Sequence, residues 1–199
     1  MRTDQPEKKW LSAYKNGDTA ALGLLVEHFR KPLFAYIYNM LQGRGDAEEI
    51  YQDVWLRVIK NIGKYREKNF AGWLFRIAHN LYVDQVRKKS HVAHPIVQDV
   101  NNEDAPMIER HPSKKLTPDR QVEAKDLGIR ILAAVAKLPD DQREVFMMRT
   151  EADIPFKEIA KIQKTSLNTA LARMHYALQK MRPLLQEDYD SLGGGKYHE

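Results

Sequence analysis

Apolar residues recur every three or four positions through most of the chain, which is the spacing of one face of an α-helix. The first long stretch of this kind covers residues 22–41, and we expect Pro32 to start, kink or interrupt its helix. Two further stretches follow at 46–62 and 70–89. The pattern therefore predicts a helical unit before residue 90.

The periodicity stops over residues 91–120. Four of the nine prolines of the chain lie at 95, 106, 112 and 118. Proline lacks a backbone N–H and disfavours helix in the residue before it, so we expect an extended linker here. The chain is predicted to be all-α, with helical domains at 1–90 and 121–189 and a frayed tail at 190–199.

Two short amphipathic segments close together in the second domain resemble a helix-turn-helix. The first covers 156–162, and Ser166 is expected to cap the second. The apolar face of the second segment is Ala170, Leu171, Met174, Ala177, Leu178 and Met181. In this motif the second helix enters the major groove of DNA while the first crosses the backbone.

The candidate duplex-DNA contacts of this motif lie on both of its segments. They are Lys157, Lys164, Ser166, Asn168, Thr169 and Arg173. Lysine can neutralise phosphates, and polar side chains of the second helix can reach base edges. The spacing alone leaves open a plain antiparallel helix pair with solvated charges.

Composition indicates a soluble globular chain with unevenly distributed charge. Apolar residues make up 43% and charged residues 30%, and the formal net charge is +5. Four carboxylates and no base lie in 45–56, whereas 57–90 holds nine Lys or Arg and 156–182 holds six. The polar start and the absence of a run of about 20 apolar residues predict a cytoplasmic protein without membrane insertion.

The segment from Tyr65 to Lys89 mixes aromatic and basic residues. Aromatic rings stack on unpaired bases, and basic side chains hold the strand backbone, so this segment is a candidate for single-stranded DNA. Its candidate contacts are Trp73, Arg76, Asn80, Arg87 and Lys88. The alternative is that the aromatic residues belong to the core, which we expect for Phe70 because it lies on the apolar stripe.

Carboxylates at positions 46, 49 and 53 line one face of the predicted helix at 46–62. Asp46 and Glu49 also have the spacing of a capping box. A solvated helix face and a protein-docking face both fit this pattern.

The sequence shows no catalytic constellation. It has no cysteine, no phosphate-binding loop and no serine-elbow motif, so we expect no catalytic residue, cofactor or metal. His91 and His94 have the spacing of a metal pair, but no third ligand is fixed beside them. A metal hydrolase using this pair is the enzyme alternative.

Three stretches together resemble the sigma-70 family, specifically its extracytoplasmic-function (ECF) group. They are DAEEIYQDV at 46–54, FAGWLFRIAHNLYVDQVRKK at 70–89, and the second-domain motifs at 138–139, 143–146 and 158–160. The resemblance implies an alternative sigma factor whose partners are core RNA polymerase, promoter DNA and an anti-sigma protein.

The resemblance also implies residue roles. Asp46, Glu49 and Asp53 would face the largest polymerase subunit. Trp73, Arg76 and Asn80 would lie at the melted promoter strand of the −10 element. Ser166, Thr169 and Arg173 match the helix that reads the −35 element.

The second domain departs from the family pattern. Asn168, Ala170, Leu171 and Ala172 stand where the family usually has glycine, valine, lysine and serine, and Tyr176 and Leu178 replace basic residues. Fewer cations predict weaker phosphate anchoring and an unusual promoter, or a domain that chiefly contacts protein. The rival interpretation is a helix-turn-helix activator that binds duplex DNA without polymerase, which leaves the aromatic and basic cluster unexplained.

Limited proteolysis of the free chain tests the predicted division into domains. Exposed irregular segments are cut before packed helices, so the first cuts should fall in 91–120 and release two protected fragments. Mass spectrometry of the early products locates the cuts. First cuts inside 20–85 or 125–180 would contradict the prediction.

Overall fold

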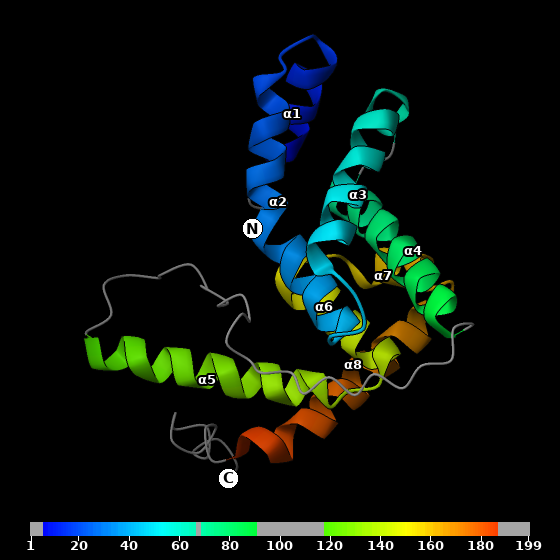
Figure 1. Ribbon diagram of the computed structural model, residues 1–199. Helices are drawn as coiled ribbons and strands as arrows, with labels where there is room; N and C mark the ends of the chain where they lie inside the picture. The colour runs from blue at the N-terminus through cyan, green and yellow to red at the C-terminus, as the bar shows by residue number, and fades with distance from the viewer. Residues whose placement is uncertain (1–5, 67–68, 91–117, 187–199) are drawn as a thin grey trace.

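The computed structural model describes residues 6–66, 69–90 and 118–186, and within these residues every regular element is a helix (Figure 1). The first group of helices is α1 (Pro6–Lys15), α2 (Ala20–Leu41), α3 (Ala47–Asn61), the 3₁₀ helix η1 (Ile62–Lys64) and α4 (Phe70–Ser90). The second group is α5 (Pro118–Ala136), α6 (Asp140–Ala152), α7 (Phe156–Ile162), α8 (Leu167–Met181) and the 3₁₀ helix η3 (Arg182–Leu185). The predicted all-α class with two helical domains is confirmed.

The effects of two prolines differ from the sequence-based prediction. The helix α5 begins at Pro118, inside the predicted linker, because proline at the first helical position has no N–H to satisfy and is already set to a helical φ. The helix α2 runs through Pro32 without interruption, since packing of its buried face outweighs the single lost hydrogen bond. The rest of the predicted linker and the tail lie outside the described residues.

Side-chain caps fix the starts of α3 and α8, two of the helices that carry predicted contacts. The carboxylate of Asp46 accepts hydrogen bonds from the backbone N–H groups of Glu48 and Glu49 at 2.8 and 3.2 Å. The hydroxyl of Ser166 accepts from the N–H of Thr169 at 3.0 Å. Both predicted caps are present, and each satisfies N–H groups that a helix end leaves without a partner.

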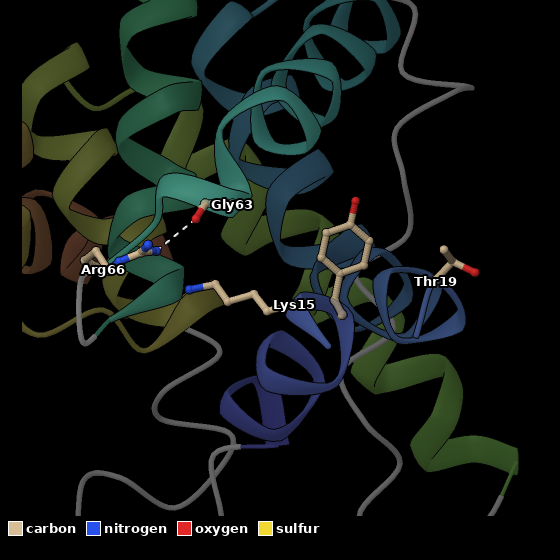
Figure 2. Close-up of a pocket in the computed structure, with 5 residues that line it drawn as sticks. Lys15, Thr19, Gly63 and Arg66 are labelled. Carbon is tan, nitrogen blue, oxygen red and sulfur yellow. Dashed lines mark hydrogen bonds between the residues drawn. The ribbon is translucent and has the colours of Figure 1, made fainter. Parts of the chain in front are cut away.

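The corner between α3 and α4 is held by short hydrogen bonds to its own backbone (Figure 2). The guanidinium of Arg66 donates to the carbonyl oxygens of Gly63 and Tyr65 at 2.8 and 3.0 Å. The ammonium of Lys15, at the end of α1, donates to the same Tyr65 oxygen at 2.7 Å. These contacts tie α1 to the corner and fix the path of residues 62–66.

The two helical domains pack against each other, which the sequence did not predict. Helix α6 lies against α2, and α7 lies against α4 (Figure 1). Glu144 of α6 is 4% exposed and sits at the centre of this interface. Its carboxylate accepts from the hydroxyl of Tyr36 at 2.6 Å and lies 2.6 Å from Nδ1 of His79. Burial, and then the charge of Glu144, raise the pKa of Tyr36 well above its usual value, so the phenol stays a donor.

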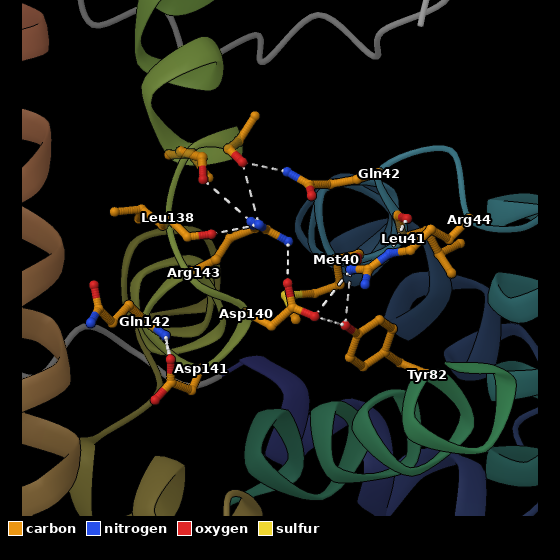
Figure 3. Close-up of polar contacts among 12 residues, drawn as sticks. Met40, Leu41, Gln42, Arg44, Tyr82, Leu138, Asp140, Asp141, Gln142 and Arg143 are labelled. Carbon is orange, nitrogen blue, oxygen red and sulfur yellow. Dashed lines mark hydrogen bonds and ion pairs between the residues drawn. The ribbon is translucent and has the colours of Figure 1, made fainter. Parts of the chain in front are cut away.

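A second carboxylate of α6 joins the domains nearer to the surface (Figure 3). Asp140 accepts from the hydroxyl of Tyr82 at 2.7 Å and pairs with Arg44 at 3.1 Å. Burial and the hydrogen bond to Asp140 raise the pKa of Tyr82 to about 12. Burial opposes ionisation of Asp140, but the contacts with Tyr82 and Arg44 outweigh it and lower the pKa of this carboxyl. Asp140 therefore stays ionised. Its stabilisation of the contact between the two domains would be lost only as the pH falls through this lowered pKa.

Replacing Tyr36 with phenylalanine tests the buried contact. The change removes one hydrogen bond to a buried carboxylate, which is worth about 1.5–3 kcal/mol, so the domains should separate at a lower urea concentration. The matched control is Tyr38→Phe, a half-buried tyrosine on the same helix.

Energy transfer between dyes on Lys60→Cys and Lys180→Cys measures the separation, since the chain has no cysteine of its own and both lysines are exposed. If Tyr36→Phe and Tyr38→Phe gave equal urea midpoints for domain separation, the hydrogen bond from Tyr36 to Glu144 would not hold the domains together.

Candidate nucleic-acid interface

A hollow of about 510 Å³ lies where α3, η1 and α4 meet. Its lining residues are Arg57, Asn61, Lys64, Tyr65, Arg66, Trp73, Ile77 and Asn80. Two of the five residues predicted to contact single-stranded DNA, Trp73 and Asn80, are among them. The hollow is thus built from the aromatic and basic segment together with the end of the preceding helix.

Local structure places these side chains around one opening. Helix α3 supplies Arg57 and Asn61 from its last turns, and the amide of Asn61 donates back to the carbonyl oxygen of Arg57 at 2.8 Å. Helix α4 supplies Trp73, Ile77 and Asn80, whose spacings of four and three residues put them on one helix face. The fixed corner at 62–66 closes the space between the two helices.

Trp73 is held by neighbouring rings but keeps part of its surface free. Its ring centroid lies 4.9 Å from that of Tyr65 and 5.6 Å from that of Phe70. Phe70 is 2% exposed and belongs to the core, as expected. Trp73 is half-buried and lines the hollow, so a fixed indole is available for stacking on a base.

The hollow is strongly cationic. Arg57, Lys64 and Arg66 line it, and none of its lining residues is acidic. Cations around an open hollow attract a polyanion, and an amide such as that of Asn80 can both donate to and accept from a base edge. The combination of ring, amide and cations suits an unpaired nucleotide.

The other three predicted single-strand contacts lie outside this hollow. Arg76 is half-buried on the adjoining face of α4, and Arg87 and Lys88 are exposed near the end of that helix. Sequence reasoning missed Arg57, Asn61 and the corner residues as site residues. The run of basic residues from position 57 indicated a cationic surface. It did not predict the turn that brings Arg57 and Asn61 opposite Trp73.

The helix-turn-helix forms as predicted, from α7 and α8. Lys157, Lys164, Ser166 and Asn168 are exposed on it. Thr169 is half-buried, with its hydroxyl 2.8 Å from that of Ser166.

Arg173 is engaged within its own domain. Its guanidinium pairs with Asp141 at 2.9 Å and donates to the side-chain oxygen of Gln163 at 2.7 Å. The side chain is 26% exposed, so part of it remains accessible.

The predicted apolar face of α8 is partly wrong. Ala170, Ala177 and Met181 are buried, but Leu171 and Leu178 are 43% and 50% exposed. The spacing made both leucines candidates for the core, but only the narrower stripe of Ala170, Ala177 and Met181 is buried on α8.

The acidic face of α3 is available at the surface. Asp46, Glu49 and Asp53 are all exposed, and Asp46 also caps the helix. Leu56 and Ile59 on the same helix are 52% and 44% exposed. Exposed apolar residues beside unpaired carboxylates fit a protein-docking face better than a merely solvated one.

The remaining predictions of absence concern metal and membrane. Among the described residues, no three His, Asp or Glu side chains are grouped so as to hold a metal ion, and no helix is long and apolar enough to cross a membrane. His91 and His94 lie outside the described residues.

Comparison with known proteins agrees with this geometry. The family model for Sigma-70 region 2 matches residues 25–92, which contain the hollow and the acidic face. The model for Sigma-70, region 4, matches residues 128–181, which contain the helix-turn-helix.

One curated relative and two solved structures are also similar to this chain. The ECF RNA polymerase sigma factor SigW of Bacillus subtilis is 27% identical over 181 residues, covering 90% of this chain and 97% of the relative. The solved structure of CnrH with the cytosolic domain of CnrY matches with a TM-score of 0.60 at 19% identity, over 92% of this chain and 98% of CnrH. The solved structure of RpoE with the anti-sigma factor NepR from Bartonella quintana matches with a TM-score of 0.53 at 21% identity, over 81% of this chain and 96% of RpoE.

The fold and the two matched regions define a transcription initiation factor with two DNA-binding domains. The chain belongs to the sigma-70 family, and within it to the ECF group, so it is an alternative sigma factor.

Proposed function

We propose that this sigma factor directs core RNA polymerase to its promoters by trapping an unpaired base of the −10 element in the hollow between α3 and α4. The observation that carries this proposal is the half-buried indole of Trp73 beside Asn80 in a hollow lined by three cations and no carboxylate. Stacking holds any base, and the amide of Asn80 adds base preference at one position.

Other surfaces take the remaining steps. The acidic face of α3, with Asp46, Glu49 and Asp53, docks on the polymerase. Arg76, Arg87 and Lys88 continue the cationic surface of α4 along the DNA backbone. The helix-turn-helix contacts the −35 element through Lys157, Lys164, Ser166, Asn168, Thr169 and Arg173, although the internal partners of Arg173 limit its freedom.

The proposal includes the partners and the setting. The chain does no covalent chemistry and needs no cofactor, because recruitment and strand capture are binding events. It acts in the cytoplasm, where polymerase and promoters are. An anti-sigma protein is a further proposed partner, supported by the complex of a similar fold with NepR.

The rival activator that binds duplex DNA without polymerase is not favoured. It would use only the helix-turn-helix. It gives no role to the match with Sigma-70 region 2 or to the hollow that lies within it.

The variant Asn80→Ala tests strand capture. It removes the only amide of α4 that lines the hollow, so it should relax base preference at one −10 position. Arg57→Ala should weaken promoter opening on all sequences, because a phosphate contact carries no base identity. Arg76→Ala should weaken promoter opening less, because Arg76 lies outside the hollow.

Permanganate footprinting with reconstituted holoenzyme measures promoter opening by all three variants. Wild-type opening by Asn80→Ala and Arg57→Ala on every promoter variant would show that the hollow does not capture the strand. Duplex binding by the helix-turn-helix should not change.

The variant Asp53→Lys tests polymerase docking. Reversing an exposed charge on a helix changes stability by under about 0.5 kcal/mol, so the fold should persist while affinity for core polymerase falls. Asp84→Lys, an exposed carboxylate on α4, makes the same charge change away from this face. Surface plasmon resonance at moderate salt gives both affinities, and equal affinities would contradict the docking assignment.

A further inference from the structure

The first two turns of α8, residues 167–173, are the part of the helix-turn-helix that would meet base pairs. In this motif the N-terminal residues of the second helix contact base edges in the major groove. Four of these residues are exposed, namely Leu167, Asn168, Leu171 and Ala172. Leu167 and Leu171 are 46% and 43% exposed, although leucine is large and apolar. Three of the four exposed side chains are therefore apolar.

The one cation among residues 167–173 is already held by protein contacts. Nε of Arg173 pairs with Asp141 of α6 at 2.9 Å, and a terminal nitrogen donates to the side-chain oxygen of Gln163 at 2.7 Å. An arginine that reads guanine aims two donors at O6 and N7 of the base. Because two of its three nitrogens are engaged within the domain, Arg173 suits a phosphate contact better than this bidentate contact.

The hydroxyl groups at the start of α8 are also engaged with each other. The hydroxyl of Ser166 accepts from the N–H of Thr169 at 3.0 Å and lies 2.8 Å from the hydroxyl of Thr169. Residues 166–173 contain no Asp or Glu, the side chains that accept a hydrogen bond from cytosine. Among residues 167–173, Asn168 is thus the exposed side chain that offers polar atoms to a base edge.

This set of side chains fits A·T pairs. An asparagine amide donates to N7 of adenine and accepts from its N6 amino group, which is a bidentate contact. The C5 methyl of thymine is the apolar group that a base pair presents in the major groove, and apolar side chains contact it. Asn168 and Ala172 are four residues apart and share one helix face, and Leu171 is the neighbour of Ala172.

We propose that the first two turns of α8 read A·T pairs in the −35 element. Asn168 contacts an adenine, Leu171 and Ala172 contact thymine methyl groups, and no side chain of these turns selects a G·C pair. The inference rests on the proposed function, because the helix-turn-helix must first contact the −35 element. It adds which base pairs are chosen and which side chains choose them.

Selection from a promoter library randomised in the upstream element tests the choice of base. Holoenzyme reconstituted from core polymerase and the full-length chain binds the library, and the bound DNA is sequenced. The preferred upstream positions should select A·T pairs. Asn168→Ala should abolish the preference for one adenine, a change of about fivefold to 150-fold. Selection of G·C pairs at the preferred positions, or an unchanged preference in Asn168→Ala, would overturn the inference.

Deoxyuridine in place of thymidine removes one methyl group and keeps the base pair, so it separates a methyl contact from a preference for the shape of A·T-rich DNA. At the thymine that Leu171 contacts, this change should lower the affinity of the holoenzyme by up to about fourfold. Leu171→Ala should remove that difference. Leu178→Ala should keep it, since Leu178 is an exposed leucine of the same helix beyond its first two turns. The inference fails if wild type binds every deoxyuridine promoter like its thymidine parent, or if Leu171→Ala keeps the full difference.

The same selection distinguishes this inference from the proposed function. If the wild-type holoenzyme opens promoters but selects no base at any upstream position, the helix-turn-helix does not read a −35 element, and the inference fails with that assignment. If the holoenzyme selects upstream G·C pairs, the −35 assignment stands and only the inference is overturned.

Discussion

The buried carboxylate of Glu144 is the contact on which the arrangement of the two domains depends. At 4% exposure it needs hydrogen-bond partners, because an ionised group without them is costly to bury. Tyr36 and His79 of the first domain supply two, and Gln163 of its own domain supplies a third at 2.8 Å. The same carboxylate thus stabilises the helix-turn-helix domain and joins it to the first domain.

This packing leaves the proposed functional surfaces of the first domain open. The covered side of α4 presents His79 and Tyr82 to α6, while Trp73 and Asn80 on another face line the hollow. The acidic face of α3 is also exposed. The proposed sites for polymerase and for the unpaired strand are therefore accessible while the two domains are still in contact.

Local signals in the sequence predicted the helices and their caps well. Asp46 and Ser166 were readable because a cap depends on a few neighbouring residues. The hollow was only half predictable, since Arg57 and Asn61 meet Trp73 through a turn whose path depends on tertiary packing. The role of Glu144 was not predicted, because its partners across the domain interface lie 65 and 108 residues away in the sequence. Leu171 and Leu178 fitted a helical core stripe, but exposure depends on neighbouring helices as well as on spacing.

Run-off transcription with core polymerase across genomic promoter fragments tests most directly whether this chain selects promoters and opens them. The account predicts discrete transcripts that appear only when the chain is added and that fade with Asn80→Ala. Absence of chain-dependent transcripts, combined with tight binding of the chain alone to the same duplex fragments, would contradict it.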